Sequence, residues 1–119
     1  MESLKRNYDF QKVYTEGKSY ANRYLVMYLL KNKTEKNRIG ISVSKKVGNS
    51  VVRHRVKRLI KESYRFNDKN FMQGYDIVII ARTTAKGKSY QEMESALNHL
   101  AKLHHIIIDE KNIWQQKRR

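Results

Sequence analysis

The stretch KKVGNSVVRHRVKRLIKES, residues 45–63, interleaves lysines and arginines with valine, leucine and isoleucine and contains a single glutamate near its end. Asn49 is the expected N-cap of a helix that continues to about residue 65 or 66. Apolar and small side chains recur along one stripe of this helix, which is expected to dock on a sheet. The neighbouring stripe carries Arg53, Lys57 and Lys61, and His54, Arg58 and Arg65 widen this charged face, which we call the cationic ridge.

The composition of the whole chain favours a polyanionic partner. The 119 residues suffice for one domain with a modest core, and we expect a single domain over 1–119. A formal net charge of +15 favours nucleic acid or an anionic membrane surface as the partner. No apolar run approaches the ~20 residues of a membrane span, and MESLKRNYDF lacks the apolar region of a secretory signal. The absence of cysteine excludes disulfides and suits a cytoplasmic protein.

The remaining sequence alternates between expected helices and strands. We expect a first helix over about 8–16, started by Asn7 or Asp9, and then strands over 23–31 and 38–45, with a short extra strand allowed at 19–21. The helix after Asn49 is followed by a strand over 75–82. A last helix is opened by a capping box of Ser89 and Glu92. The apolar run at 77–80 is typical of a central strand with a parallel neighbour. The pattern predicts an α+β fold with a mixed sheet of about four strands and about three helices. Its core spans about 7–105, and 106–119 receives no assignment.

The alternation of side chains along two expected strands indicates a surface with aromatic walls. Ile39, Ile41 and Val43 alternate with small residues, so one face of the strand at 38–45 is core and the other leaves space. Tyr28 lies on the corresponding face of the strand at 23–31. With Phe10 and Tyr14 of the first helix it can border an open groove, where bases of a single-stranded nucleic acid would stack on the rings. Ordinary core packing of these aromatics is an equally good interpretation of the pattern alone.

The stretch at 45–63 also resembles the signature of the bacterial ribonuclease P protein component, KxGNxVxRNRxKRxxRE. The segments DFQKVYTEGKSYANRYLVMY, RIGISVSKK and YDIVIIAR resemble the same family in order and spacing, so the resemblance covers most of residues 7–105. Two positions depart from the pattern. His54 replaces the usual asparagine and lacks the paired donor and acceptor of an amide, and Lys61 replaces an arginine and loses its bidentate fork.

The resemblance implies a fold and a function. Members of the family contain a rare left-handed β-α-β crossover, whereas general experience favours a right-handed one. The implied function is that of the protein subunit of ribonuclease P, which removes the 5′ leader of precursor tRNA. In that enzyme the RNA subunit performs the hydrolysis with Mg²⁺, which the RNA mainly binds, and no organic cofactor is implied. The implied partners are the catalytic RNA and precursor tRNA, with no membrane and no obligate protein partner.

The resemblance also implies roles for individual residues. The implied contacts to the catalytic RNA are Lys46, Asn49, Arg53, His54, Arg55, Lys57, Arg58 and Lys61. The implied contacts to the leader are Phe10, Tyr14, Tyr28 and Lys45. No residue of the protein is implied in catalysis, and the resemblance leaves open whether the protein itself holds a metal.

The residues themselves offer no convincing catalytic or metal site. His104 and His105 stand near Asp109 and Glu110, but adjacent side chains diverge, which favours a solvated or packed cluster over a metal site. Asp76 is expected in a turn or an ion pair. The alternatives left open are a general RNA- or DNA-binding module without a role in cleavage, a membrane-surface helix, a duplex DNA reader and a protein nuclease that acts alone.

Overall fold

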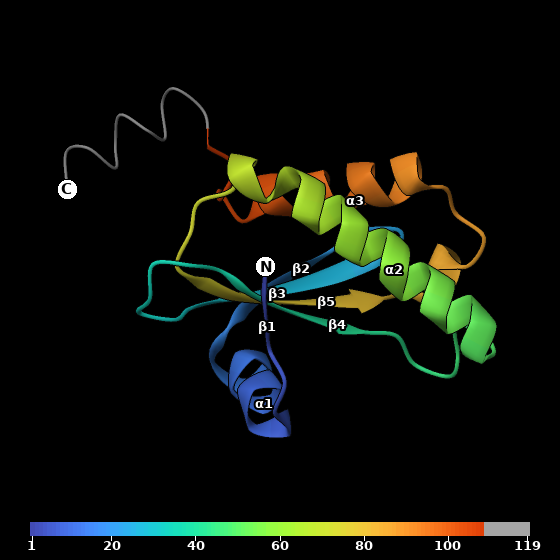
Figure 1. Ribbon diagram of the computed structural model, residues 1–119, viewed down its shortest axis with the longest axis horizontal. Helices are drawn as coiled ribbons and strands as arrows, with labels where there is room; N and C mark the ends of the chain where they lie inside the picture. The colour runs from blue at the N-terminus through green and yellow to red at the C-terminus, as the bar shows by residue number, and fades with distance from the viewer. Residues whose placement is uncertain (109–119) are drawn as a thin grey trace.

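A five-stranded sheet with the order β1-β4-β5-β3-β2 forms the centre of the molecule (Figure 1). The computed structural model describes residues 1–108, so the expectations about Asp109, Glu110 and the rest of the tail lie outside the described residues. In chain order the elements are β1 (Glu2–Ser3), α1 (Asn7–Glu16), β2 (Lys18–Ala21), β3 (Leu25–Lys31), β4 (Arg38–Ser42), α2 (Ser50–Asn67), β5 (Tyr75–Ala81) and α3 (Tyr90–Leu103). The α+β class and the three α-helices within residues 1–108 agree with the prediction.

Several boundaries differ from the sequence prediction. The fifth strand is β1, a two-residue segment that pairs with β4 in parallel and was not expected. The side chain of Leu4, just after it, is buried. The first helix is preceded by Arg6 as the N-cap residue, whose side chain makes no capping bond, so neither Asn7 nor Asp9 caps it. Strand β4 ends at Ser42 because the chain turns at residues 45–47.

The sheet separates two layers of helices. Helices α2 and α3 cover one face and α1 covers the other (Figure 1). The larger core lies under α2 and α3, where Met27 and Ile79 of the sheet meet Ile60 of α2 and Leu97 of α3. The smaller cluster lies under α1 and is built on Leu4, Val13 and Val78. The continuous apolar run of β5 is explained by its place between these two layers.

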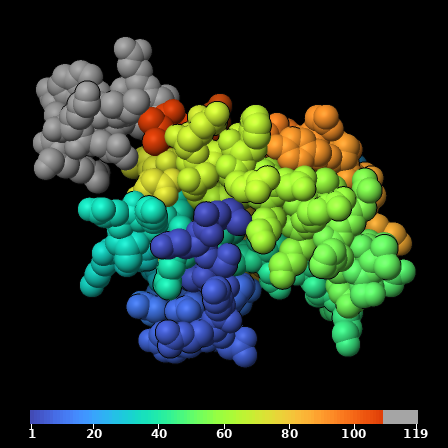
Figure 2. Space-filling view, in the orientation of Figure 1, coloured from blue at the N-terminus to red at the C-terminus, as the bar shows by residue number. Residues whose placement is uncertain are grey.

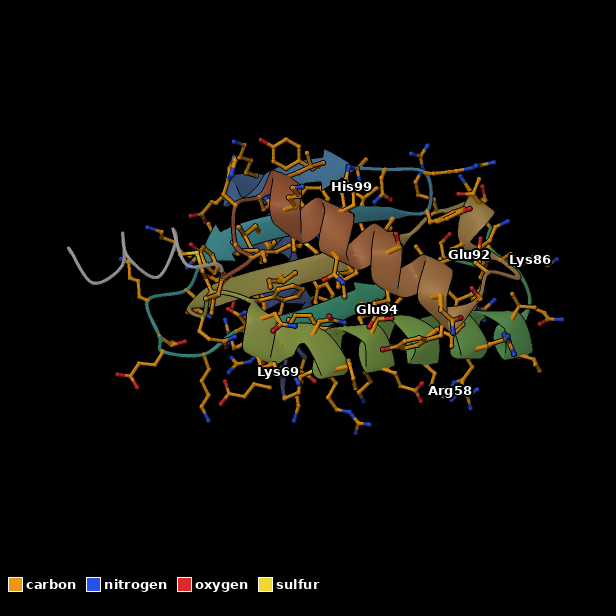
Figure 3. All side chains as sticks on the ribbon, turned by 90° about the horizontal axis from the view of Figure 1, so that it is seen from above. Arg58, Lys69, Lys86, Glu92, Glu94 and His99 are labelled. Atoms are coloured by element: carbon orange, nitrogen blue, oxygen red, sulfur yellow. The ribbon has the colours of Figure 1, made fainter. Side chains whose placement is uncertain are left out.

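The connection from β4 through α2 to β5 is left-handed. The two strands are parallel neighbours, so α2 is their crossover helix. In Figure 3 the layer of α2 and α3 faces the viewer, both strands run to the right, and β5 lies beyond β4 on the side away from α2. The chain therefore winds opposite to the usual crossover. This is the handedness that the family resemblance implies.

Two sequence signals at helix starts are confirmed. Asn49 Oδ1 accepts a hydrogen bond from the Val52 backbone N–H at 3.0 Å. Ser89 and Glu92 form a complete capping box, in which each side chain accepts a hydrogen bond from the other residue's backbone N–H. Beyond α3, His104 is buried, with its Nε2 2.9 Å from the Met27 carbonyl oxygen. This histidine packs in the core, and its burial lowers its pKa.

Candidate nucleic-acid interface

The cationic ridge covers the outward side of α2. Val56, Ile60 and Tyr64 bury the opposite side of the helix against the core. Arg58 points outward, away from α3 (Figure 3). Figure 2 shows the side chains of α2 along one side of the molecule, above the N-terminal segment and α1. The exposed basic side chains on this side are His54, Arg55, Lys57, Arg58, Lys61 and Arg65, and Arg53 is half-buried.

No charge of the ridge belongs to an ion pair within residues 1–108. Among residues 1–108, the ion pairs join Arg38 to Asp9 and Asp76 and involve no residue of α2. A hollow of about 560 Å³ is bordered by Val51, His54, Arg55 and Arg58 near the start of the helix. Uncompensated cations in fixed positions on a rigid helix are a typical contact surface for a phosphate backbone.

The loop before α2 is held in one conformation by its own residues. Val47 is buried, while Lys45 and Lys46 beside it are exposed. An Arg53 Nη1–H donates a hydrogen bond to the Gly48 carbonyl oxygen at 2.9 Å. A Cβ at Gly48 would lie only 2.7 Å from the Val52 side chain, which explains the glycine. Asn49 and Arg53 therefore have structural tasks in addition to any contact with RNA.

Phe10, Tyr14 and Tyr28 form one aromatic cluster on the other face of the sheet. The ring centroids of Phe10 and Tyr14 are 6.5 Å apart, and those of Tyr14 and Tyr28 are 5.1 Å apart in an edge-to-face arrangement. All three side chains are half-buried. Burial raises the pKa of Tyr14, a hydrogen bond with Ser42 opposes that rise, and the proximity of Tyr28 adds to it. The expected association of the three rings is confirmed, although their role in binding stays a prediction.

The space beside the cluster is smaller than the strand pattern indicates. Gly40, Val78 and Tyr28 lie in one row across β4, β5 and β3. A Cβ at Gly40 would be 2.6 Å from two atoms of the Phe10 ring, so this ring already occupies the space above the glycine. The small residues left beside the cluster are Ser42, which is half-buried, and Ser44, which is exposed. We therefore expect contact with a ligand on the Tyr14 and Tyr28 side of the cluster.

Replacing Gly40 with alanine should destabilise the protein by about 1 kcal/mol, because the new methyl group overlaps the Phe10 ring. The ring must turn away from the sheet to relieve this contact. Urea unfolding of the variant and the parent protein measures the cost. The same substitution in a Phe10→Ala protein should cost little, since the space is then vacant. Equal costs in both backgrounds would contradict this packing arrangement.

Arg38 and Asp76 connect the sheet to α1, the helix that carries Phe10 and Tyr14. The Arg38 guanidinium donates to both carboxylate oxygens of Asp76, at 2.8 and 2.6 Å, and its Nη2 lies 3.9 Å from Asp9 of α1. Asn32 Nδ2 donates a further hydrogen bond to Asp76 at 3.0 Å. The hydrogen bond with Asp76 raises the pKa of Arg38. Asp76 thus belongs to an ion pair, as the sequence indicates, and its partner Arg38 was not expected.

Comparison with known proteins shows the family to which the chain belongs. A family model described as Ribonuclease P matches residues 1–104. The chain belongs to the bacterial ribonuclease P protein family. It is 65% identical over 106 residues to the ribonuclease P protein component of Lachnoclostridium phytofermentans, covering 89% of this chain and 91% of that one. A Clostridium botulinum ribonuclease P protein component is 58% identical over 100 residues, covering 83% and 90%.

Solved ribonuclease P proteins share the fold. The Staphylococcus aureus protein superposes with a TM-score of 0.83 at 38% identity, covering 91% of this chain and 99% of that chain. The Thermotoga maritima protein gives 0.79 at 32% identity, covering 86% and 96%. This member of the ribonuclease P family is therefore the protein component of a ribonucleoprotein endoribonuclease in tRNA processing. Catalysis in that enzyme is carried out by the RNA subunit.

Proposed function

We propose that the two surfaces of this ribonuclease P protein bind different RNAs. The cationic ridge, with Lys46 and Asn49 just before α2, contacts the catalytic RNA, and the aromatic cluster, with Lys45, contacts the 5′ leader of precursor tRNA. The observation that carries this proposal is that the cationic ridge lies on α2 and the aromatic cluster on α1 and β3, with α1 and α2 on opposite faces of the sheet (Figure 1). Each surface can therefore be occupied without displacing the other.

The ridge suits a folded RNA because it offers charge without base recognition. Its cations have no acidic partners within residues 1–108 and extend along an 18-residue helix. Such contacts fix the position of an RNA through its phosphates. The proposed contacts are Lys46, Asn49, Arg53, His54, Arg55, Lys57, Arg58 and Lys61.

The aromatic cluster suits a single strand because unpaired bases can stack on rings. Tyr14 and Tyr28 are half-buried, so each ring is anchored by the protein and keeps part of its surface open. Lys45 is exposed in the turn that follows β4 and supplies a cation for a phosphate of the same strand. A leader that runs past Ser42 and Ser44 toward Lys45 would meet both features.

The Mg²⁺ of the enzyme would be bound mainly by the RNA subunit. Within residues 1–108, no group of three or more histidine, aspartate or glutamate side chains is placed to hold a metal ion. The carboxylates of Asp9 and Asp76 near the cluster already face Arg38. The metal supplies the activated nucleophile and charge stabilisation that phosphodiester cleavage needs. The protein's cations reduce the repulsion between RNA phosphates, which lowers the Mg²⁺ concentration needed for assembly.

Adding the protein to a bacterial ribonuclease P RNA and precursor tRNA at low Mg²⁺ should restore 5′ maturation that the RNA alone does not perform. The measurement is the yield of mature tRNA and free leader on a denaturing gel over a Mg²⁺ series. A Lys57→Ala/Arg58→Ala protein is the matched comparison, since both side chains are exposed and the variant loses two ridge cations, and it should stimulate cleavage less than the parent protein. Equal cleavage with and without the parent protein across the series would contradict the proposal.

Within residues 1–108, no helix has both the length and the apolar character that a membrane crossing needs.

A further inference from the structure

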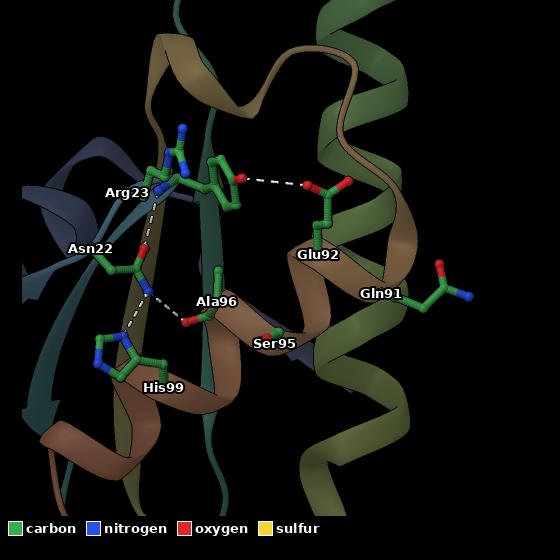
Figure 4. Close-up of a pocket in the computed structure, with 8 residues that line it drawn as sticks. Asn22, Arg23, Gln91, Glu92, Ser95, Ala96 and His99 are labelled. Atoms are coloured by element: carbon green, nitrogen blue, oxygen red, sulfur yellow. Dashed lines mark hydrogen bonds between the residues drawn. The ribbon is translucent and has the colours of Figure 1, made fainter.

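A hollow of about 540 Å³ lies between the turn that joins β2 to β3 and the outer side of α3 (Figure 4). Its lining includes Asn22, Arg23 and Tyr24 from the turn and Glu92 and His99 from α3. Helix α3 covers the sheet face opposite to α1, so the hollow is separate from the aromatic cluster (Figure 1). Its size is in the range of small-ligand sites.

Hydrogen bonds within the protein fix the turn that lines the hollow. Asn22 Oδ1 accepts from the backbone N–H groups of Tyr24 and Leu25, at 3.2 and 3.0 Å. Asn22 Nδ2 donates to the Ala96 carbonyl oxygen at 2.8 Å and lies 3.2 Å from His99 Nδ1. These bonds fix the turn and pin it to α3 (Figure 4). A prefixed site loses little conformational freedom when a ligand binds.

The hollow combines a ring with a lining cation, Arg23, and Lys88 lies beside the same ring. The Tyr24 ring has the Arg23 guanidinium carbon 5.7 Å and the Lys88 Nζ 5.4 Å from its centroid. Its hydroxyl donates a hydrogen bond to Glu92 at 3.3 Å, which fixes the direction of the ring. Since His99 Nδ1 accepts from Asn22, the proton of the neutral ring is on Nε2, which is left as a donor. The hollow therefore offers a stacking surface, two cations, a donor and a carboxylate acceptor.

Positive charge continues from the hollow around one end of the molecule. Arg82 and Lys86, in the segment between β5 and α3, are exposed. Arg82 Nη1 donates to the Asn22 carbonyl oxygen at 2.7 Å, which places this arginine beside the turn. Lys86 and Glu92 lie toward the end of the molecule where α2 begins (Figure 3). A ligand with several phosphates would meet more of these charges than a ligand with one.

We propose that the hollow binds one unpaired nucleotide of an RNA strand, with its base stacked on Tyr24 and its phosphate held by Arg23 and Lys88. Stacking displaces one of the two cations from the ring, and the displaced cation joins the other in pairing with the accompanying phosphate. Glu92 accepts a hydrogen bond from a donor group on the base edge. The continuation of charge to Lys86 favours a nucleotide within a strand over a free nucleotide. This contact adds to the two proposed above and does not depend on their roles.

The first test maps the binding of three probes by the amide NMR spectrum of the full chain: octa-adenylate RNA, adenosine 5′-monophosphate and inorganic phosphate. With octa-adenylate, the amide signals of Tyr24, Glu92 and His99 should shift and saturate, at a concentration at least tenfold lower than with the monophosphate. An absence of shifts at these residues would overturn the proposal. So would equal shifts with inorganic phosphate, or equal affinity for the oligonucleotide and the mononucleotide.

The second test separates stacking from charge, using the same NMR signals as the readout. Tyr24→Leu keeps apolar bulk but removes the ring, and should weaken octa-adenylate binding at the hollow by about 5-fold to 150-fold. Arg23→Ala/Lys88→Ala should lower the slope of log affinity against log salt by about 0.7 for each lost phosphate contact. Lys31→Ala/Lys36→Ala removes the same charge elsewhere on the surface and should leave that slope unchanged.

A Tyr24→Leu protein that keeps its melting temperature and binds octa-adenylate at the hollow as the parent does would overturn the stacking contact. An equal loss of slope in the two charge variants would overturn the role of Arg23 and Lys88. Tyr28→Ala should leave the shifts at Tyr24 and His99 intact. Failure of the leader assignment and failure of this inference are therefore distinguishable.

Discussion

Raising the monovalent salt concentration from 50 to 200 mM should weaken binding of the protein to ribonuclease P RNA by about a hundredfold to a thousandfold. The reason is counterion release: each phosphate neutralised contributes about 0.9 to the slope of log affinity against log salt, and the ridge has cations for about five. The affinity is measured by titrating labelled RNA with protein at fixed Mg²⁺ over a series of salt concentrations.

A ridge variant makes this salt experiment specific to α2. Arg58→Ala should reduce the slope by about one, because Arg58 points outward from the helix and has no acidic partner within residues 1–108 (Figure 3). Lys36→Ala removes one charge from the exposed β3–β4 connection and should leave the slope unchanged. A nearly flat salt dependence of the parent protein would mean that the ridge is only solvated.

The sequence predicts structure best where a pattern of neighbouring residues is compatible with only one local conformation. Asn49 caps α2 and Ser89 pairs with Glu92 because each signal needs only residues three positions apart. The alternation in β4 correctly predicted that Ile39 belongs to the core and that Gly40 faces the other side. These patterns also placed the cationic ridge on the solvent side of α2.

Other features depend on contacts between distant segments. Strand β1 has only two residues, and its position follows from the burial of Leu4 and the bond from its N–H to the Ile39 carbonyl oxygen. The open space expected above Gly40 is filled by Phe10, which approaches from α1. The pairing of Arg38 with Asp76 across neighbouring strands is set by their register.

The handedness of the crossover illustrates a different limit. Residues of β4, α2 and β5 predict a β-α-β unit, but their pattern would fit either hand, and experience with other proteins favours the right-handed form. The left-handed form was expected only from the family resemblance. The hollow beside α3 was missed because Asn22 and His99, which meet in it, are 77 positions apart.

Replacing Tyr28 with alanine should weaken the binding of precursor tRNA to the assembled enzyme by about 1–3 kcal/mol, because one stacked base loses its ring. Arg58→Ala should instead weaken assembly with the catalytic RNA, whatever the substrate, since a phosphate contact carries no information about the leader. The measurements are the affinity of the protein for the catalytic RNA and the affinity of each assembled enzyme for precursor tRNA.

Structural damage must be separated from loss of stacking, since Tyr28 is half-buried and contacts Tyr14. Truncation of a packed tyrosine can cost several kcal/mol of stability and would then disturb both binding activities together. Leu30→Ala is the matched control, because Leu30 packs in the smaller core under α1, as Tyr28 does, but has no ring. It should lower the melting temperature without altering the preference for precursor tRNA. Tyr28→Phe should keep both stability and preference.

The most direct measurement is the ratio of precursor to mature tRNA affinity for enzymes assembled with the parent, Tyr28→Ala and Arg58→Ala proteins. Mature tRNA lacks the leader, so its affinity should be the same for all three once assembly is saturated. We expect the ratio to fall about 5-fold to 150-fold with Tyr28→Ala and to stay at the parent value with Arg58→Ala. A folded Tyr28→Ala protein with an unchanged ratio, or an Arg58→Ala protein with a reduced one, would contradict the division of labour between the two surfaces.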